Sequence, residues 1–174
     1  GYNGDMSFFK GQKIRTMENP YHIQFWKAVK ANPTPMTFSE VYIGLQQGTI
    51  DAQENAYTLI ESAKLYEQQK YIVETNAVPD YITLIASDEF MKERTPEEQK
   101  IIRKAAEIAQ QMACDAADSG REKCKKILEK DGMKVQELSD ETWAEMQKAS
   151  EPVYESIKEK TGDHLFELYS KGVR

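Results

Sequence analysis

Two polar side chains near the ends of short apolar segments offer the chemistry of binding rather than that of a reaction. Arg15 lies near the end of the segment 12–17, and Asn55 follows the segment 49–52. A guanidinium can hold a carboxylate through two parallel hydrogen bonds, and a neighbouring amide can add a directional bond. Phe38, between them in the sequence, can supply an apolar wall. These residue types indicate a site for a small organic anion.

Each of these residues also fits an ordinary structural role that the sequence leaves open. Arg15 fits the surface of a strand, Asn55 fits a helix N-cap, and Phe38 fits the hydrophobic core. Glu54 is the acid whose position is unusual, because it lies in a polar loop rather than at a helix start. We expect it to pair with Arg15 or with a backbone amide rather than to act as a general base.

The groups that enzymes and metal sites require do not occur in the necessary patterns. His22 and His164 are the only histidines, and neither has metal-ligand spacing or a neighbouring cysteine. The sequence contains no glycine-rich phosphate loop and no Gly-x-Ser-x-Gly turn. We therefore predict a protein that is not an enzyme and that has no catalytic residues, no metal and no cofactor.

The composition argues against two other classes. The 174 residues carry a formal net charge of −6, whereas nucleic-acid binding needs a concentrated surface of lysine and arginine. No apolar run approaches the roughly 18 to 20 residues that span a bilayer, and no signal peptide is visible. The length suits one domain or a little more.

The elements that must position these side chains alternate in type along the first half of the chain. Strands are expected at 12–17, 34–36, 49–52, 71–75 and 81–86, and helices at 20–31, 37–47 and 57–69. This alternation is typical of an α/β fold with a mainly parallel sheet, whose ligands collect at the carboxyl ends of the strands. Arg15 and Asn55 lie at two such ends.

The pattern becomes helical in the second half. Thr95, Pro96 and the acids after them form a strong helix start, and this helix is expected to reach Lys130. At about 1.5 Å per residue it would be roughly 50 Å long, so it should span two bodies or bend near Gly120. Its apolar seam contains Ile101, Ala105, Ile108, Met112 and Ala116.

Further elements complete the expected organisation. A strand at 133–138 precedes a helix at 139–161, whose apolar face includes Trp143, and a last helix begins at Asp163. We divide the chain into a lead-in (1–11), an α/β lobe (12–86) and a helical segment (87–174).

Several short motifs resemble the solute-binding subunit of TRAP transporters, the DctP family. They are Lys13-Ile14-Arg15, Asn32-Pro33-Thr34-Pro35-Met36, Phe38-Ser39-Glu40-Val41-Tyr42 and Asp51-Ala52-Gln53-Glu54-Asn55. Their order and spacing fit the family, and later stretches extend the resemblance to nearly the whole chain. Ala52 and Ala56 replace the glycine and proline that are usual in the family around Gln53-Glu54-Asn55, so the backbone geometry of this loop is expected to differ. Ala77 replaces a histidine that many members have after Thr75-Asn76.

The resemblance implies a fold and a set of contacts. Family members have two periplasmic-binding-protein-like α/β lobes that close over the ligand, with a long helix across both. It implies that Arg15 forms a salt bridge with the substrate carboxylate, Asn55 hydrogen-bonds the substrate and Phe38 packs on it. Three supporting residues would stand behind these contacts: Gln53, Glu54 and Met36.

The resemblance also implies a function for residues 12–86 as a substrate-binding lobe. The protein would capture a C4-dicarboxylate or a sugar acid, outside the cytoplasm in the periplasm or at the extracellular membrane face, and deliver it to TRAP permease subunits. The first lobe is expected to be largely missing, so this chain should bind weakly, with Arg15 hydrated, and should self-associate through exposed apolar surface. The alternative is a helical protein-interaction module without a small-molecule ligand.

Overall fold

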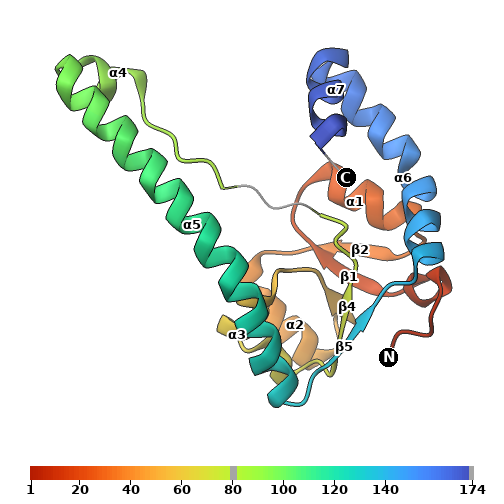
Figure 1. Cartoon of the computed structure of the whole chain (residues 1–174). Coiled ribbons are helices and arrows are strands. Elements are labelled where there is room, and N and C mark those ends of the chain that lie inside the picture. The colour runs from red at the N-terminus through yellow and green to blue at the C-terminus, as the bar shows by residue number, and fades with distance from the viewer. Residues whose placement is uncertain (79–81, 173–174) are drawn as a thin grey trace.

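Three parallel strands form the sheet around which the N-terminal half is arranged. A computed structural model describes residues 1–78 and 82–172 of the chain. The strands of this sheet are β1 (Lys13–Thr16), β2 (Asn32–Pro35) and β3 (Ala52–Gln53). They pair in the order β2-β1-β3, and β1 and β2 lie side by side in Figure 1. The register places Arg15 of β1 beside Thr34 on one side and Gln53 on the other. Paired residues of parallel strands share a face, so these three side chains lie on the same side of the sheet.

A second, two-stranded sheet joins distant parts of the sequence. Its strands are β4 (Tyr71–Glu74) and β5 (Lys134–Glu137), and they are also parallel. The expected α/β class with parallel strands is therefore confirmed. Because β5 comes from the segment 87–174 and β4 from the segment 12–86, the two segments share this sheet, and the division between them stays a prediction.

The helical segments that connect the strands of the first sheet begin and end at capping residues. The helices are α1 (Pro20–Ala28), the 3-10 turn η2 (Phe38–Glu40) and α2 (Val41–Gln47). The Asn19 side chain accepts hydrogen bonds from the first turn of α1, and Thr37 forms a capping box with Glu40. Gly48 ends α2 with φ at 71°, a left-handed conformation that glycine adopts without steric cost.

The chain before β1 is more ordered than a lead-in. The 3-10 turn η1 (Met6–Phe9) is capped by the Asp5 side chain, and Phe9 is buried against Trp26. The aromatic residues of this segment do not follow a helical period, so the packing could not be predicted from the sequence.

The helix predicted at 57–69 is wrong in its second half. Helix α3 (Tyr57–Ser62) ends early because Lys64 has φ at 54°, which breaks the helical hydrogen-bond pattern. The 3-10 turn η3 (Leu65–Glu67) follows, with Leu65 buried. No glycine or proline marks this break, so it could not be predicted from the sequence.

The strand predicted at 81–86 is also not found. Tyr81 lies outside the described residues, and residues 82–86 form no strand. Ile82 is 97% exposed, and no strand among the described residues pairs with this apolar segment. A short helix, α4 (Asp88–Lys92), follows with Ser87 as its N-cap, and it was not predicted.

Helix α5 (Pro96–Lys130) confirms the long helix predicted from its start signal. Thr95 and Glu98 form a capping box at the predicted start, and the helix continues through Gly120 to Lys130. In Figure 1 its C-terminal end lies beside α3 and β5, whereas its N-terminal end extends away from both sheets. The apolar seam predicted along it is exposed, including Ile101 at 61% and Ile108 at 51%. Within α5, all of whose residues the structure describes, Leu128 is the one buried residue.

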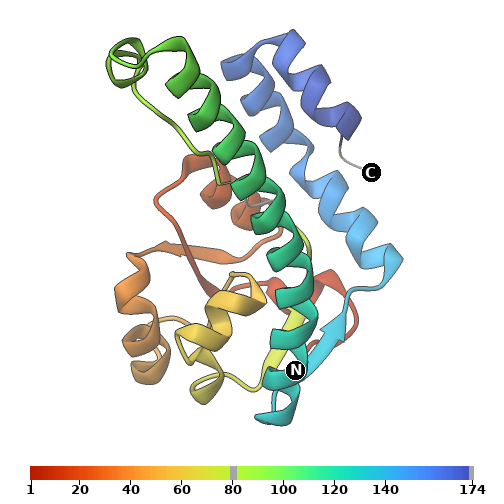
Figure 2. The ribbon, with the colours of Figure 1, turned by 60° about the vertical axis from the view of Figure 1, so that its left-hand side comes forward.

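Two further helices follow the second sheet in the sequence. Helix α6 (Asp140–Thr161) packs on α1 and is followed by α7 (Asp163–Gly172), which runs antiparallel beside it (Figure 2). Trp143, expected on the apolar face of α6, is 41% exposed. The buried side chains are Thr142, Met146, Ser150 and Val153. Within residues 1–78 and 82–172, no helix has the length and hydropathy of a membrane span.

Two hydrophobic clusters hold these layers together. One joins η1, β1, α1 and α6 around Ile14, Trp26 and Met146. The other joins α2, α3 and the C-terminal end of α5 around Val41, Ile60 and Leu128. The first sheet and its site therefore depend on the docking of only the last part of α5.

We expect Leu128→Ala to lower the free energy of unfolding by about 2–5 kcal/mol, because Leu128 is fully buried and its truncation leaves a cavity. Lys126→Ala, at an exposed position on the same helix and outside the apolar seam, serves as the control and should change it by less than about 0.5 kcal/mol. Urea denaturation measures both. Equal effects of the two substitutions would contradict this packing.

Candidate ligand-binding site

Arg15 lies inside the protein at the carboxyl end of β1. The residue is 4% exposed, and its Nε–H donates a hydrogen bond to the Met36 backbone oxygen at 2.9 Å. Its guanidinium carbon lies 5.7 Å from the centre of the Phe38 ring, within cation–π range. With Nε engaged by Met36, a carboxylate would be held by the two terminal amino groups. Arg15 is not a surface residue of the strand, and the expectation that it stays hydrated is wrong.

The negative charge of Glu54 acts on the buried Arg15. Burial lowers the pKa of the Arg15 guanidinium below its usual value, and the negative charge of Glu54 opposes that shift. An arginine side chain keeps its proton at neutral pH even so. The predicted pairing of Glu54 with Arg15 therefore has an electrostatic basis in the structure.

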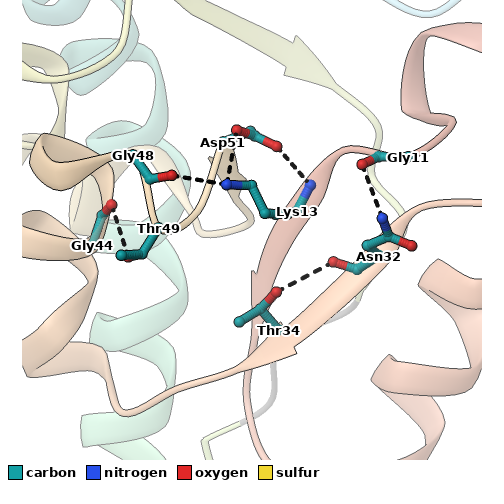
Figure 3. Close-up of polar contacts among 8 residues, drawn as sticks. All are labelled: Gly11, Lys13, Asn32, Thr34, Gly44, Gly48, Thr49 and Asp51. Atoms are coloured by element: carbon teal, nitrogen blue, oxygen red, sulfur yellow. Dashed lines mark hydrogen bonds and ion pairs between the residues drawn. The ribbon is translucent and has the colours of Figure 1, made fainter.

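The opposite end of the first sheet is closed by polar contacts of another kind (Figure 3). The Lys13 backbone N–H donates to Asp51 Oδ2 at 2.9 Å, and Lys13 Nζ donates to the Gly48 oxygen at 2.8 Å. Asn32 Nδ2 donates to the Gly11 oxygen at 3.1 Å. These contacts tie the amino ends of the strands to the adjacent turns, so the carboxyl ends are left to build the site.

Asn55 is linked by a hydrogen bond to Gln53, the residue beside Arg15 in the sheet. Its Nδ2 donates to Gln53 Oε1 at 2.6 Å, and Gln53 is the residue of β3 in register with Arg15. Asn55 is not a helix N-cap, because the N-cap of α3 is Ala56. Phe38 is 39% exposed and is not a core residue. The ordinary roles that the sequence left open for these residues are therefore not the ones they have.

The residues predicted from the sequence lie in one place. Met36 and Phe38 contact the guanidinium, Glu54 acts on it electrostatically, and Gln53 lies beside it in the sheet. Asn55 joins through Gln53. A buried cation, an amide and an aromatic ring at the carboxyl ends of parallel strands can bind a small carboxylate that also carries hydrogen-bonding groups.

A carboxylate behind the site was not predicted. Glu74, at the end of β4, accepts a hydrogen bond from the Tyr57 hydroxyl at 2.7 Å. Its other oxygen lies 3.2 Å from Lys125 Nζ, and Arg121 of the same helix lies 3.7 Å away. This cluster ties α5 to β4 and to α3. Its member on α3, Tyr57, lies two residues after Asn55. The sequence offers no signal for it, because its members are 17 and 51 positions apart.

The pKa of Glu74 reflects these contacts. Burial alone would raise it, but the Tyr57 hydroxyl, Lys125 and Arg121 favour the charged carboxylate and bring the pKa of Glu74 below its usual value. Burial and the bond to Glu74 raise the pKa of the Tyr57 hydroxyl. The hydroxyl therefore acts as the donor and the carboxylate as the acceptor at neutral pH.

Known proteins are similar to this chain in sequence and in fold. Residues 6–161 match the family described as bacterial extracellular solute-binding protein, family 7. This chain belongs to that family. It is 34% identical over 164 residues to an ectoine-binding periplasmic protein of Halomonas elongata, covering 92% of this chain and 48% of that protein. Members of the family to which it is similar are thus periplasmic solute-binding proteins rather than enzymes.

Solved structures of family 7 proteins agree with the arrangement of strands and helices. A TRAP periplasmic solute-binding protein from Polaromonas bound to D-erythronate is 32% identical, with a TM-score of 0.84 over 94% of this chain and 54% of the other. A second, from Ralstonia eutropha with bound (S)-2-acetolactate, is 27% identical with a TM-score of 0.87, over 95% of this chain and 55% of the other. The chain therefore spans about half the length of these family members.

Glu74→Gln should lower the free energy of unfolding by about 1–3 kcal/mol at neutral pH, because the amide cannot pair with Lys125 and Arg121. The folded-state pKa of Glu74 is depressed, so the stabilisation is present above its usual value of 4.5 and is lost as the pH falls through the folded-state value. Urea denaturation at several pH values should show the difference between wild type and variant shrinking on acidification.

The control for this experiment is Glu137→Gln, on β5. Glu137 is exposed and lies opposite Glu74 in the sheet. Its substitution should have little effect on stability at neutral pH. A pH-independent difference between wild type and Glu74→Gln would contradict the ionic role of Glu74.

Proposed function

We propose that this chain is part of an extracytoplasmic solute-binding protein that captures a small carboxylate, either a C4-dicarboxylate or a sugar acid. The observation that carries the proposal is the buried guanidinium of Arg15 at the carboxyl end of β1, with Phe38 over it and Asn55 nearby. Membership of family 7 supports it, as does the acid bound to the Polaromonas relative, D-erythronate.

Binding would use the two terminal amino groups of Arg15. Phe38 covers the guanidinium and is partly exposed, so it is the side chain that must repack as a carboxylate arrives. A charge-assisted pair formed there is stronger than one in water, because the surroundings of a buried guanidinium have a lower effective dielectric constant. Gln53, Glu54 and Met36 would hold the three contact residues in place.

The remaining parts of the proposal follow from the family. The protein would bind its ligand without transforming it, in the periplasm or at the extracellular face of the membrane, and would pass it to TRAP permease subunits. Residues 12–86 would carry most of the contacts, and the helices of residues 87–174 would support them. Family membership does not favour the alternative of a helical interaction module without a ligand.

In the full-length protein, we expect Arg15→Ala to weaken carboxylate binding by about 30-fold or more, because removal of one partner of a buried charge pair costs about 2–5 kcal/mol. Isothermal titration calorimetry with a panel of dicarboxylates and sugar acids measures this. Lys13→Ala is the control, since Lys13 lies on the same strand with an exposed ion pair to Asp51 and should leave affinity unchanged. Equal affinities of wild type and Arg15→Ala would refute the assignment.

We further propose that this chain, as it stands, self-associates through the exposed seam of α5. Ile101, Ile108 and Met112 are each more than half exposed on one face of a single helix, and burial of such side chains between two copies is favourable. Their spacing of seven and four residues places them on one stripe.

Analytical ultracentrifugation of the wild-type chain should detect dimers or larger species, and Ile108→Glu should shift them toward monomer. Gln110→Glu introduces the same charge about 180° away around the helix and should leave association unchanged. A wild-type chain that remains monomeric at high concentration would exclude this proposal, without bearing on ligand binding.

A further inference from the structure

Three amide side chains form a chain of hydrogen bonds that leads away from the site. Asn55 Nδ2 donates to Gln53 Oε1 at 2.6 Å, and Gln53 Nε2 donates to Gln69 Oε1 at 3.3 Å. All three residues are partly buried. This series of hydrogen bonds therefore connects the proposed ligand contact, Asn55, to Gln69, which lies 14 positions further along the sequence.

The two ends of an amide have nearly the same shape, so its orientation is decided by its hydrogen-bond partners. The Gln69 oxygen holds the NH₂ group of Gln53, which turns the Gln53 oxygen toward Asn55. That oxygen in turn holds one N–H of Asn55. Asn55 then presents its carbonyl oxygen and its second N–H, so it can accept and donate toward a ligand at once.

Gln69 is suited to set this orientation because its backbone is fixed on several sides. Its N–H donates to the oxygen of Leu65, which is 1% exposed, and the neighbouring Gln68 donates through Nε2 to the Tyr42 hydroxyl at 2.9 Å. On the other side, the Lys70 oxygen accepts from the Lys134 N–H at 2.8 Å, at the start of the second sheet. The break at Lys64 is what places this segment after η3 rather than in a longer helix.

We propose that Gln69 is a positioning residue that fixes the amide orientation of Asn55 for ligand binding. It does not touch the ligand and acts through Gln53. The inference rests on the proposed function, because it takes Asn55 to be a ligand contact.

The first test reads the positioning directly and needs no ligand. In the ¹⁵N-labelled chain, one side-chain N–H of Asn55 should be protected from exchange by its bond to Gln53. Gln69→Met keeps the length of the side chain but removes the strong acceptor, and it should increase the exchange rate of that N–H severalfold. Gln69→Glu keeps an acceptor at this position and should retain the wild-type rate. An Asn55 signal that does not respond to Gln69→Met would overturn the proposal.

The second test measures affinity in the full-length protein, with the carboxylate that binds most tightly in a panel of D-erythronate, other sugar acids and dicarboxylates. Gln69→Met should weaken binding by about fivefold, the effect of one neutral hydrogen bond. Gln69→Glu should restore most of the loss. Lys70→Gln changes the net charge by the same amount as Gln69→Glu, one residue away at an exposed position, and corrects for the added negative charge.

The outcomes separate this inference from the proposed function. If Arg15→Ala abolishes binding but Gln69→Met leaves both affinity and exchange unchanged, the role of Gln69 is refuted and the carboxylate site stands. If no acid in the panel binds, or binding does not need Arg15, the proposed function fails whatever Gln69 does to Asn55. If Asn55→Ala leaves affinity unchanged while exchange of the Asn55 N–H in the otherwise wild-type chain still responds to Gln69→Met, the hydrogen-bond series exists but does not serve binding. The proposed role of Gln69 in ligand binding is then refuted.

Discussion

The buried positive charge of Arg15 is the constraint on which the rest of the first sheet depends. Arg15 is 4% exposed, so its guanidinium must be compensated inside the protein, and here a backbone oxygen, an aromatic ring and a nearby acid provide the compensation. The three groups come from residues 36, 38 and 54, which follow two different strands. Neither β2 nor β3 can shift its register without removing part of that compensation. The site and the order of the strands are therefore linked.

The sequence predicts those features whose signals are local. The start of α5 lies where the Thr95-Pro96 pattern indicated, and α1 and η2 begin within one residue of the predicted helix starts, because a helix start depends on residues within one helical turn. The parallel arrangement followed from the alternation of elements. The places of Arg15 and Asn55 near two strand ends indicated a site, whereas the individual contact roles were expected because the motifs resemble those of a family.

The features that the sequence did not predict depend on tertiary contacts. Lys64 carries no intrinsic preference for a left-handed conformation, yet it ends α3 and lets Leu65 enter the core. Trp143 is exposed because the buried side of α6 is formed by other residues, among them Thr142 and Met146. The bonds of Gln69 and Glu74 join residues that no periodic pattern relates. Apolar content alone also cannot say whether residues 82–86 find a partner strand.

The position of β5 has a consequence for how the chain reaches its native state. The strands of the first sheet are separated by short connections, but β4 and β5 meet only after α4 and α5 have been passed. Closing a longer loop costs more entropy, although each doubling of length adds only about 0.6 kcal/mol. Non-local pairing slows folding more than it lowers stability. Pairing of the two-stranded sheet is therefore expected to slow folding more than pairing of the first sheet does. Anchoring of α5 by Leu128 opposes this effect, because it brings β5 close to β4.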